Sequence, residues 1–152
     1  GDKVAVFGRG GVLLQYADEV QRRHVQLSVQ VESLRLRVDA EGLLLALRNL
    51  FENALKYTRE RQHPHIQVQA RRNELGVVLI IADNGIGFEM EYHDHIFKIF
   101  QRLHRDDQYP GTGIGLALVR KAVERIGGKV WAQSRPGEGA TFNIQLPKSA
   151  MV

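Results

Sequence analysis

The sequence of 152 residues contains no cysteine, and none of its apolar runs is long enough to cross a membrane. The absence of cysteine excludes disulfide bonds and thiolate metal sites, and it is compatible with the reducing cytoplasm, where we expect the protein to act. Because a signal-peptide pattern is also missing at the start, we expect no direct membrane contact. Internal repeats and low-complexity tracts are absent too, so we expect residues 1–152 to form one globular domain.

The charge of the chain points only weakly to a partner. Its 21 Lys and Arg and 17 Asp and Glu give a formal net charge of +4, which invites a nucleic-acid interpretation. The basic residues are scattered, however, and the densest group, Arg59–Arg61 with Arg71–Arg72, lacks the interleaved aromatic residues that single-strand binders use. We therefore interpret this group as a solvated basic face and expect no nucleic-acid partner.

Hydrophobic periodicity predicts a mixture of helices and short strands. Helices are expected over about Gly10–His24, from an N-cap at Asp39 to about Tyr57, over a short segment Glu91–Phe100, and over about Gly113–Ile126. Strands are expected at Gln26–Glu32, His65–Arg71, Val77–Ala82, Lys129–Ser134 and Ala140–Leu146, the last four as two hairpins. This pattern predicts an α+β fold: a two-layer α/β sandwich with a mixed, mostly antiparallel sheet and about three main helices on one face.

The long helix after Asp39 carries an unusual polar stripe. Asn49, Asn53 and Lys56 lie at i, i+4 and i+7, within about 60° of one another and opposite a broad leucine-rich face. Asparagine is a poor helix former, so two of them in mid-helix call for a reason. Their side-chain carbonyls suit a hard cation such as Mg²⁺, and the lysine suits phosphate. Taken alone, the pattern is better explained by a hydrogen-bonded or solvated stripe.

Two glycine-rich segments follow this helix. Asp83-Asn84-Gly85-Ile86-Gly87 comes directly after an apolar strand, where a carboxylate can accept from an exocyclic amine and the glycines make room for a flat ring. The segment 109–119, YPGTGIGLALV, opens a helix, as anion-binding loops do. Alone, the first segment is an ordinary turn sequence and the second a weak phosphate-loop signal.

The order of these segments carries more weight than any one of them. An Asn-x-x-x-Asn helix, then DxGxG, then Phe97 and Phe100, then GTGIGL resembles the N, G1, F and G2 boxes of sensor histidine kinases. The resemblance is to their ATP-binding catalytic domain, of the Bergerat-type fold, within the gyrase/Hsp90/histidine kinase/MutL superfamily. It covers nearly the whole chain, including GEGATF at 137–142. The segments 102–104 and 109–117 resemble the phytochrome-type branch in particular.

The resemblance implies a role for each residue that matches the phosphate end of the family site. Asn53 would ligate a Mg²⁺ ion that bridges the ATP phosphates, and Asn49 would contact phosphate or the metal's shell. Lys56 would contact phosphate, and Tyr57 would pack along the nucleotide. Arg102 would reach the γ-phosphate from a lid, so Asn49, Lys56 and Arg102 are the expected catalytic residues.

The same resemblance places adenine at the second motif. Asp83 would accept a hydrogen bond from the adenine amino group, Gly85 and Gly87 would shape the pocket, and Thr141 would support it through water. A polar lid, roughly Gln101–Pro110, would cover the nucleotide. Its hinge and the phosphate-facing backbone after it would be formed by Gly111, Thr112, Gly113, Gly115 and Leu116.

The family's phosphoacceptor histidine is not expected in this chain. Of the six histidines, none has the required setting; His93-Asp94 is nearest, and we interpret it as a surface histidine. The resemblance therefore implies an ATP-binding domain, monomeric when isolated. It would need a separate helical dimerisation domain for autophosphorylation and a response regulator downstream.

Three alternatives remain open. A hydrolase of the gyrase or Hsp90 type would need a glutamate base where this chain has Asn49, so the kinase is favoured. A serine kinase related to anti-sigma factors shares the motifs and lacks an attached acceptor domain. A degenerate module kept for protein contacts is the non-enzyme alternative, although every motif residue that the chemistry needs is present.

Overall fold

The computed structural model describes residues 15–98 and 115–152, together with the backbone of residues 3–7. In these ranges the helices are α1 (Ala17–Arg22), α2 (Ala40–Tyr57) and α3 (Gly115–Arg125). The strands are β1 (Lys3–Phe7), β2 (Gln26–Val31), β3 (Leu34–Val38), β4 (His65–Asn73), β5 (Gly76–Asp83), β6 (Lys129–Arg135) and β7 (Gly139–Pro147). Short 3₁₀ turns occur at Met90–Tyr92, His95–Phe97 and Lys148–Ala150.

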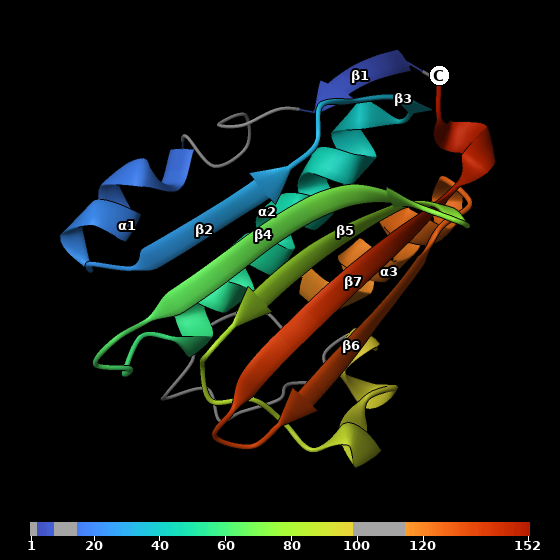
Figure 1. Ribbon diagram of the computed structural model, residues 1–152. Helices are drawn as coiled ribbons and strands as arrows, with labels where there is room; N and C mark the ends of the chain where they lie inside the picture. Colours follow the sequence, from blue (N-terminus) through green and yellow to red (C-terminus); the bar gives the residue numbers. More distant parts are fainter. Residues whose placement is uncertain (1–2, 8–14, 99–114) are drawn as a thin grey trace.

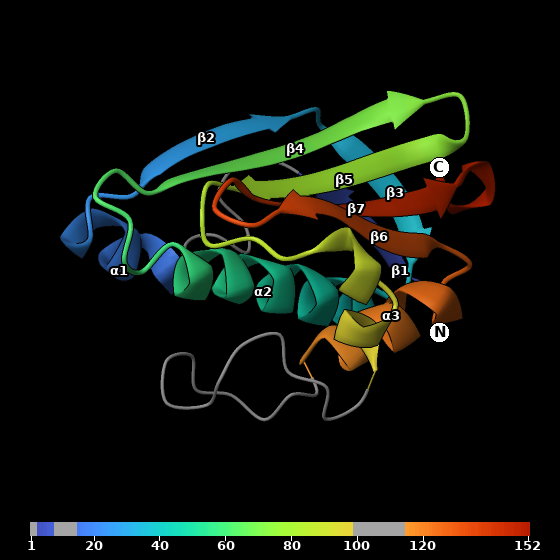
Figure 2. The ribbon, with the colours of Figure 1, turned by 90° about the horizontal axis from the view of Figure 1, so that it is seen from below.

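Five strands form the main sheet, in the order β2-β4-β5-β7-β6. β2 runs parallel to β4, and the other neighbours are antiparallel, with β4–β5 and β6–β7 as hairpins. Figure 2 shows α1, α2 and α3 on one face of this sheet, and Figure 1 shows the opposite face in front of them. The predicted α+β two-layer sandwich with a mixed, mostly antiparallel sheet is thereby confirmed.

Helix α2 forms the centre of the helical layer. The Asp39 side chain accepts a hydrogen bond of 3.2 Å from the Gly42 amide and so caps its first turn, as expected. One face of the helix is buried against the sheet, through Leu43, Ala46, Leu47, Leu50, Phe51, Ala54 and Leu55. Each fully buried Leu or Phe side chain contributes about 1.5–3 kcal/mol, so this face is the main anchor of the layer.

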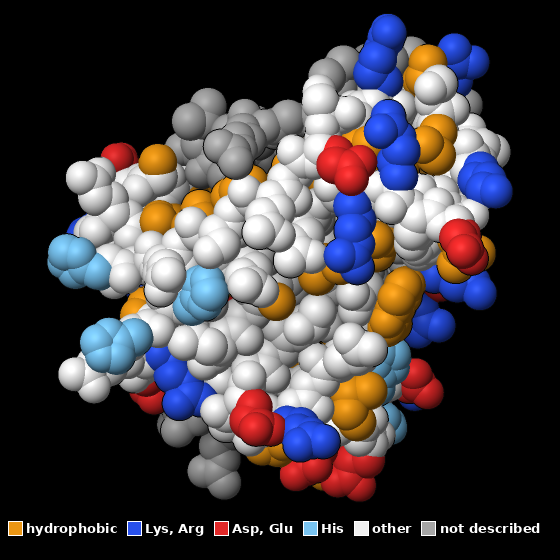
Figure 3. All heavy atoms as spheres, in the orientation of Figure 1, with side chains coloured by type: hydrophobic (Ala, Val, Ile, Leu, Met, Phe, Trp, Pro, Cys, Tyr) orange, Lys and Arg blue, Asp and Glu red, His pale blue; other side chains and the backbone are white. Residues whose placement is uncertain are grey.

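Alternation along β5 and β7 decides which side chains meet the helices. Val77, Leu79 and Ile81 are buried on the helix-facing side, and Asp83 continues the same series by one more step. In β7 the matching partner of Asp83 is Ala140. Figure 3 shows the other face of the sheet, where hydrophobic side chains occur in separate areas between polar ones.

Three details of the fold differ from the sequence-based expectation. The segment expected as a helix at Glu91–Phe100 contains two 3₁₀ turns up to Phe97. In the described part of the first expected helix, only Ala17–Arg22 are α-helical. The helix ends there because His24 adopts a left-handed backbone conformation (φ 54°). β3 was missed, although its buried and exposed residues alternate, and it pairs with β1 in a separate two-stranded sheet.

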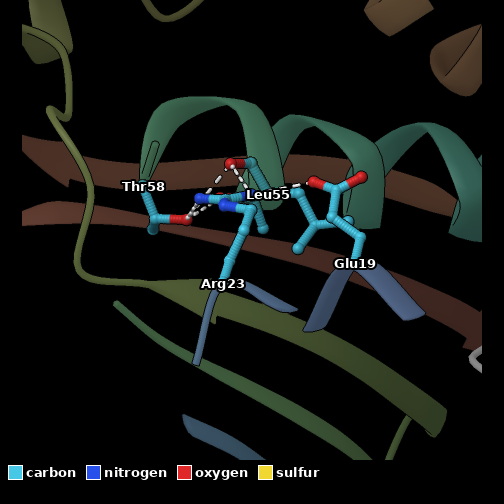
Figure 4. A network of polar contacts seen from close by, with 5 residues as sticks. Glu19, Arg23, Leu55 and Thr58 are labelled. Carbon is cyan, nitrogen blue, oxygen red and sulfur yellow. Dashed lines mark hydrogen bonds and ion pairs between the residues drawn. The ribbon is translucent and has the colours of Figure 1, made fainter. Parts of the chain in front are cut away.

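Helix α1 is attached to α2 by polar contacts at two points. Arg23 donates to the Leu55 carbonyl (2.9 Å) and to the Thr58 hydroxyl (3.4 Å) at the end of α2, and it pairs with Glu19 at 2.8 Å (Figure 4). The Tyr16 hydroxyl donates to Glu52 over 2.7 Å.

Within the described residues, none of the helices is sufficiently long and apolar to cross a membrane.

Candidate functional site

Asp83 lies at the end of β5, on the side of the sheet that faces the helices. Burial raises the pKa of its carboxyl group from 3.8 to about 6, and hydrogen bonds from the Gly85 and Ala140 amides and the charge of Arg61 act in the opposite direction. The Gly85 amide donates to Asp83 Oδ1 over 2.8 Å. The carboxylate is therefore oriented by its own turn and shielded from bulk water, and near pH 7 most of it is ionised.

The turn after Asp83 is packed directly against the end of α2. A Cβ added to Gly85 would overlap the Tyr57 carbonyl oxygen and lie 2.7 Å from the carbonyl carbon. That same oxygen accepts a hydrogen bond of 3.1 Å from the Ile86 amide. A glycine is required at position 85 because two backbone segments approach each other there more closely than a side chain permits.

The β6–β7 turn closes the other side of this region. Gly87 has a positive φ of 67°, and a Cβ there would overlap the Arg135 carbonyl oxygen. The Gly137 amide donates to the Ile86 carbonyl over 2.7 Å. Together with Asp83, the residues of this turn line a cavity of about 370 Å³, which also includes Met90 and Thr141.

The predicted polar stripe lies along one edge of α2. Asn49, Asn53, Lys56 and Tyr57 are all half-buried. The Asn49 amide nitrogen donates to the Leu45 carbonyl over 2.8 Å, which leaves its Oδ1 as an acceptor. Among the described residues the Asn53 side chain has no hydrogen-bond partner, so its carbonyl oxygen is also available.

Helix α3 begins beside this stripe. A Cβ added to Gly115, its first residue, would lie 3.0 Å from Asn49 Oδ1. Leu116, the next residue, is half-buried and packs against the core. Thus Gly115 lies beside Asn49 and Gly85 lies beside Tyr57, and these two positions on α2 are eight residues, or about 12 Å, apart. One helix edge connects the two glycine-rich segments that are distant in sequence.

Two parts of the predicted site are not brought to this edge. Thr141 lines the cavity that includes Asp83, but it pairs with Ala82 and Gln133, one residue out of step with Asp83, so alternation directs its side chain to the other face of the sheet. Its role near adenine stays a prediction. The expected lid Gln101–Pro110, with Arg102, and the residues Phe100, Gly111, Thr112 and Gly113 lie outside the described residues.

The residues present fit a magnesium–phosphate group better than a metal held by protein ligands alone. Mg²⁺ in nucleotide sites keeps waters and phosphate oxygens and takes only one or two ligands from the protein. Two amide oxygens on one helix edge, with Lys56 on the same edge, match that pattern. Within the described residues, no cluster of three or more His, Cys, Asp or Glu side chains could hold a metal by itself.

His93 is not the free surface histidine that the sequence led us to expect. Its Nε2 accepts a hydrogen bond of 3.0 Å from the Ala132 amide, at the edge strand β6. Its ring packs edge-on against Phe97, with 5.5 Å between centroids, and its side chain is only 24% exposed. Because Nε2 is already used as an acceptor, His93 closes the sheet edge and does not present that nitrogen as a nucleophile.

Sequence reasoning missed several residues that build the site. The Ser134 hydroxyl donates to Gly139 and accepts from the Phe88 amide, at 2.6 and 2.8 Å. Arg61, taken from the sequence for part of a solvated face, donates to the carbonyls of Gly85 and Gly137 at 2.9 and 2.8 Å. No local pattern marks the contacts of Arg61 or the bond between Ser134 and Phe88, since they join segments 24 to 76 residues apart.

Comparison with known proteins shows the family of the chain. Residues 38–150 match the family of histidine kinase-, DNA gyrase B- and HSP90-like ATPases. Over 109 residues, or 72% of this chain, the sequence is 41% identical to the phytochrome-like protein Cph1 of Synechocystis; the chain spans 14% of that relative's length.

Solved structures share the fold over nearly the whole chain. A mycobacterial sensor histidine kinase, MprB, superposes with a TM-score of 0.80 at 25% identity, covering 99% of this chain and all of that one. Full-length ShkA in complex with AMPPNP gives 0.76 at 25% identity, covering 99% of this chain and 32% of that one. The chain belongs to the family of histidine kinase-, DNA gyrase B- and HSP90-like ATPases and is similar to the catalytic domains of histidine kinases, including the phytochrome-like ones.

Proposed function

We propose that residues 1–152 form one cytoplasmic catalytic domain that binds Mg-ATP and donates its γ-phosphate to a histidine on a separate dimerisation domain. The observation that carries this proposal is the edge of α2 that joins Gly115 at Asn49 to Gly85 at Tyr57. It puts the half-buried carboxylate of Asp83 at one end and amide oxygens with a lysine at the other. A nucleotide, with a polar flat base and a charged phosphate chain, matches these two ends. That AMPPNP is bound in the related ShkA structure supports the assignment.

At the base end, Asp83 accepts a hydrogen bond from the adenine amino group. Its carboxylate is largely ionised near pH 7 because its pKa is about 6, and the Gly85 amide holds one of its oxygens. The close packing of Gly85 on Tyr57 leaves the base in contact with backbone and with the Tyr57 side chain rather than with water. An ionised carboxylate that is already oriented gives a stronger hydrogen bond than one exposed to solvent.

At the phosphate end, Asn53 would hold Mg²⁺ together with phosphate oxygens, Asn49 would contact phosphate or the metal's shell, and Lys56 would contact phosphate. The metal, when bound, supplies neutralisation of the charge that develops during phosphoryl transfer. The protein residues supply position: Asn49 is held by its bond to Leu45, and Gly115 lets the backbone of α3 approach. Arg102 is proposed to add a second positive charge from the lid.

Transfer to an external histidine is favoured over hydrolysis. The position one turn before Asn53 is Asn49, whose side chain cannot accept a proton from water. Glu52, the nearest carboxylate in sequence, accepts a hydrogen bond from Tyr16 and is therefore engaged with the segment before α1. The proposed partners are a helical dimerisation domain with the acceptor histidine and, after it, a response regulator; the isolated domain is proposed to be monomeric.

Titration of Mg-ATP into the wild-type domain and Asn53→Ala by calorimetry tests the binding step. We expect binding by the wild type, at least tenfold weaker binding by Asn53→Ala, and wild-type binding by a control, Asn73→Ala, in the exposed β4–β5 turn. Absence of wild-type binding would refute the proposed enzyme function. Addition of a histidine-containing dimerisation domain in trans, followed by assay of acid-labile phosphate, then separates the kinase from a hydrolase, which would release free phosphate only.

A further inference from the structure

Arg61 lies in the connection between α2 and β4 and reaches across to two other segments. Its Nη2 donates to the Gly85 carbonyl at 2.9 Å and to the Gly137 carbonyl at 2.8 Å. We propose that Arg61 is a positioning residue for adenine recognition, which ties the Gly85 turn to the Gly137 turn and so holds Asp83 where it meets the base. This inference rests on the proposed nucleotide-binding function.

The contacts of Arg61 add to backbone hydrogen bonds that connect three segments near Asp83: the end of α2, the turn after Asp83 and the β6–β7 hairpin. The Tyr57 carbonyl accepts from the Ile86 amide, which attaches the turn to α2, and the Ile86 carbonyl accepts from the Gly137 amide, which attaches it to the β6–β7 hairpin. Arg61 follows Tyr57 by four residues, and its side chain donates to the turns that contain Gly85 and Gly137. The Arg61 side chain thereby joins the turn to the hairpin, and the backbone bond between Ile86 and Tyr57 joins the turn to the helix end.

The position of the guanidinium group carries an unfavourable free energy. Its Nε is shielded from solvent and has no hydrogen-bond partner in the described part of the chain. Shielding an unpaired donor of a charged group is unfavourable, and a side chain selected only for solubility would extend into water. The nearby Arg59, by contrast, is exposed, and its side chain makes no hydrogen bond or ion pair within the described residues.

Arg61 also supplies the positive charge that acts on Asp83. Its charge lowers the pKa of the Asp83 carboxyl group, against the larger effect of burial. From β4 and β7 the residues opposite Asp83 are Ile66 and Ala140, which carry no charge. The hairpin contributes Arg135 and Glu138, which line the same cavity, are mostly exposed and pair with each other at 3.9 Å.

Calorimetric titration of Mg-ATP between pH 5 and 8 tests the role of Arg61. Arg61→Met removes both hydrogen bonds and the charge, and Arg59→Met is the matched control because it removes the same charge from the same connection. We expect Arg61→Met to bind about tenfold more weakly at pH 8, where Asp83 is ionised in every variant. We also expect the pH at which half of the affinity is lost to rise by at least about half a unit, since the ionised carboxylate loses the stabilising charge of Arg61.

Arg61→Lys keeps the charge but shortens the side chain. It should bind more weakly than the wild type at pH 8 while keeping the wild-type pH midpoint. The proposal is overturned if Arg61→Met behaves like Arg59→Met, or if it weakens binding without moving the midpoint, as a merely structural residue would. If circular dichroism shows that Arg61→Met does not fold, wild-type affinity of Arg61→Lys at pH 8 overturns the proposal. Failure of the wild type and Arg59→Met to bind at any pH refutes the nucleotide site itself.

Discussion

The carbonyl oxygen of Tyr57, the last residue of α2, accepts a hydrogen bond of 3.1 Å from the amide of Ile86. This contact joins the helix that carries Asn49 and Asn53 to the turn that carries Asp83. The two ends of the candidate site are therefore parts of one rigid unit, and a change at the contact should disturb both the stability of the fold and nucleotide binding.

Gly85→Ala should separate the turn from α2. The added Cβ would overlap the Tyr57 carbonyl oxygen, so we expect a loss of about 2–4 kcal/mol in the free energy of unfolding and loss of Mg-ATP binding. Gly137→Ala is the comparison, because its φ is +78° but nothing lies within 4 Å of its Cβ. It should cost only about 1–2 kcal/mol. Urea denaturation measures both, and equal losses would contradict the contact argument.

The stability of the domain should depend on pH through Asp83. In the unfolded chain this carboxyl group titrates near 3.8, and in the folded protein its pKa is about 6. The folded state therefore binds more protons between these values, and the free energy of unfolding falls as the pH rises through them. Relative to Asp83→Asn, the wild type should lose about 3 kcal/mol between pH 3.5 and 7.

Urea denaturation at several pH values measures this difference. Asp18→Asn, which removes an exposed carboxylate from α1, is the matched control and should follow the wild type. If the wild type instead gained stability relative to Asp83→Asn as the pH rises over this range, the raised pKa of Asp83 would be contradicted.

Arg23→Met should loosen α1 from α2. The Arg23 side chain is 18% exposed and caps the end of α2 through Leu55 and Thr58 (Figure 4). Loss of these bonds should lower the free energy of unfolding by about 1–3 kcal/mol. Arg22→Met, at the exposed neighbouring position, should change it by less than about 0.5 kcal/mol. Similar effects of the two substitutions would show that the network adds nothing to stability.

Removal of Mg²⁺ should abolish most of the stabilisation that ATP gives. A ligand that binds only the folded state at 100 times its Kd adds about 2.7 kcal/mol, which raises the Tm by several degrees. We expect EDTA to cancel this rise for the wild type and to leave the Tm of the nucleotide-free protein unchanged. For Asn53→Ala the rise should be small with or without EDTA. Differential scanning fluorimetry measures the Tm of both proteins with and without ATP and EDTA, and a full rise in EDTA would exclude a metal-dependent site.

Local patterns in the sequence determined the elements that build the site. The leucine repeat after Asp39 defines the buried face of α2 and, by exclusion, the edge with Asn49, Asn53 and Lys56. The apolar run Val77–Ala82 predicts a strand that ends at Asp83, and the two hairpins follow from apolar runs around turn residues. These properties depend on the periodicity of one segment, so a single sequence contains them.

Only the tertiary structure decided which segments meet. The approach of Gly85 to Tyr57 and the bonds of Arg61 to Gly85 and Gly137 join residues 24 to 76 positions apart. The pairing of β2 with β4 in parallel and of β3 with β1 are further examples. Contacts of this kind produce no periodic pattern in the sequence, because they depend on how the helical layer packs on the sheet. The same limit explains why Arg61 looked like a solvated residue: its partners are backbone carbonyls, and any sequence supplies those.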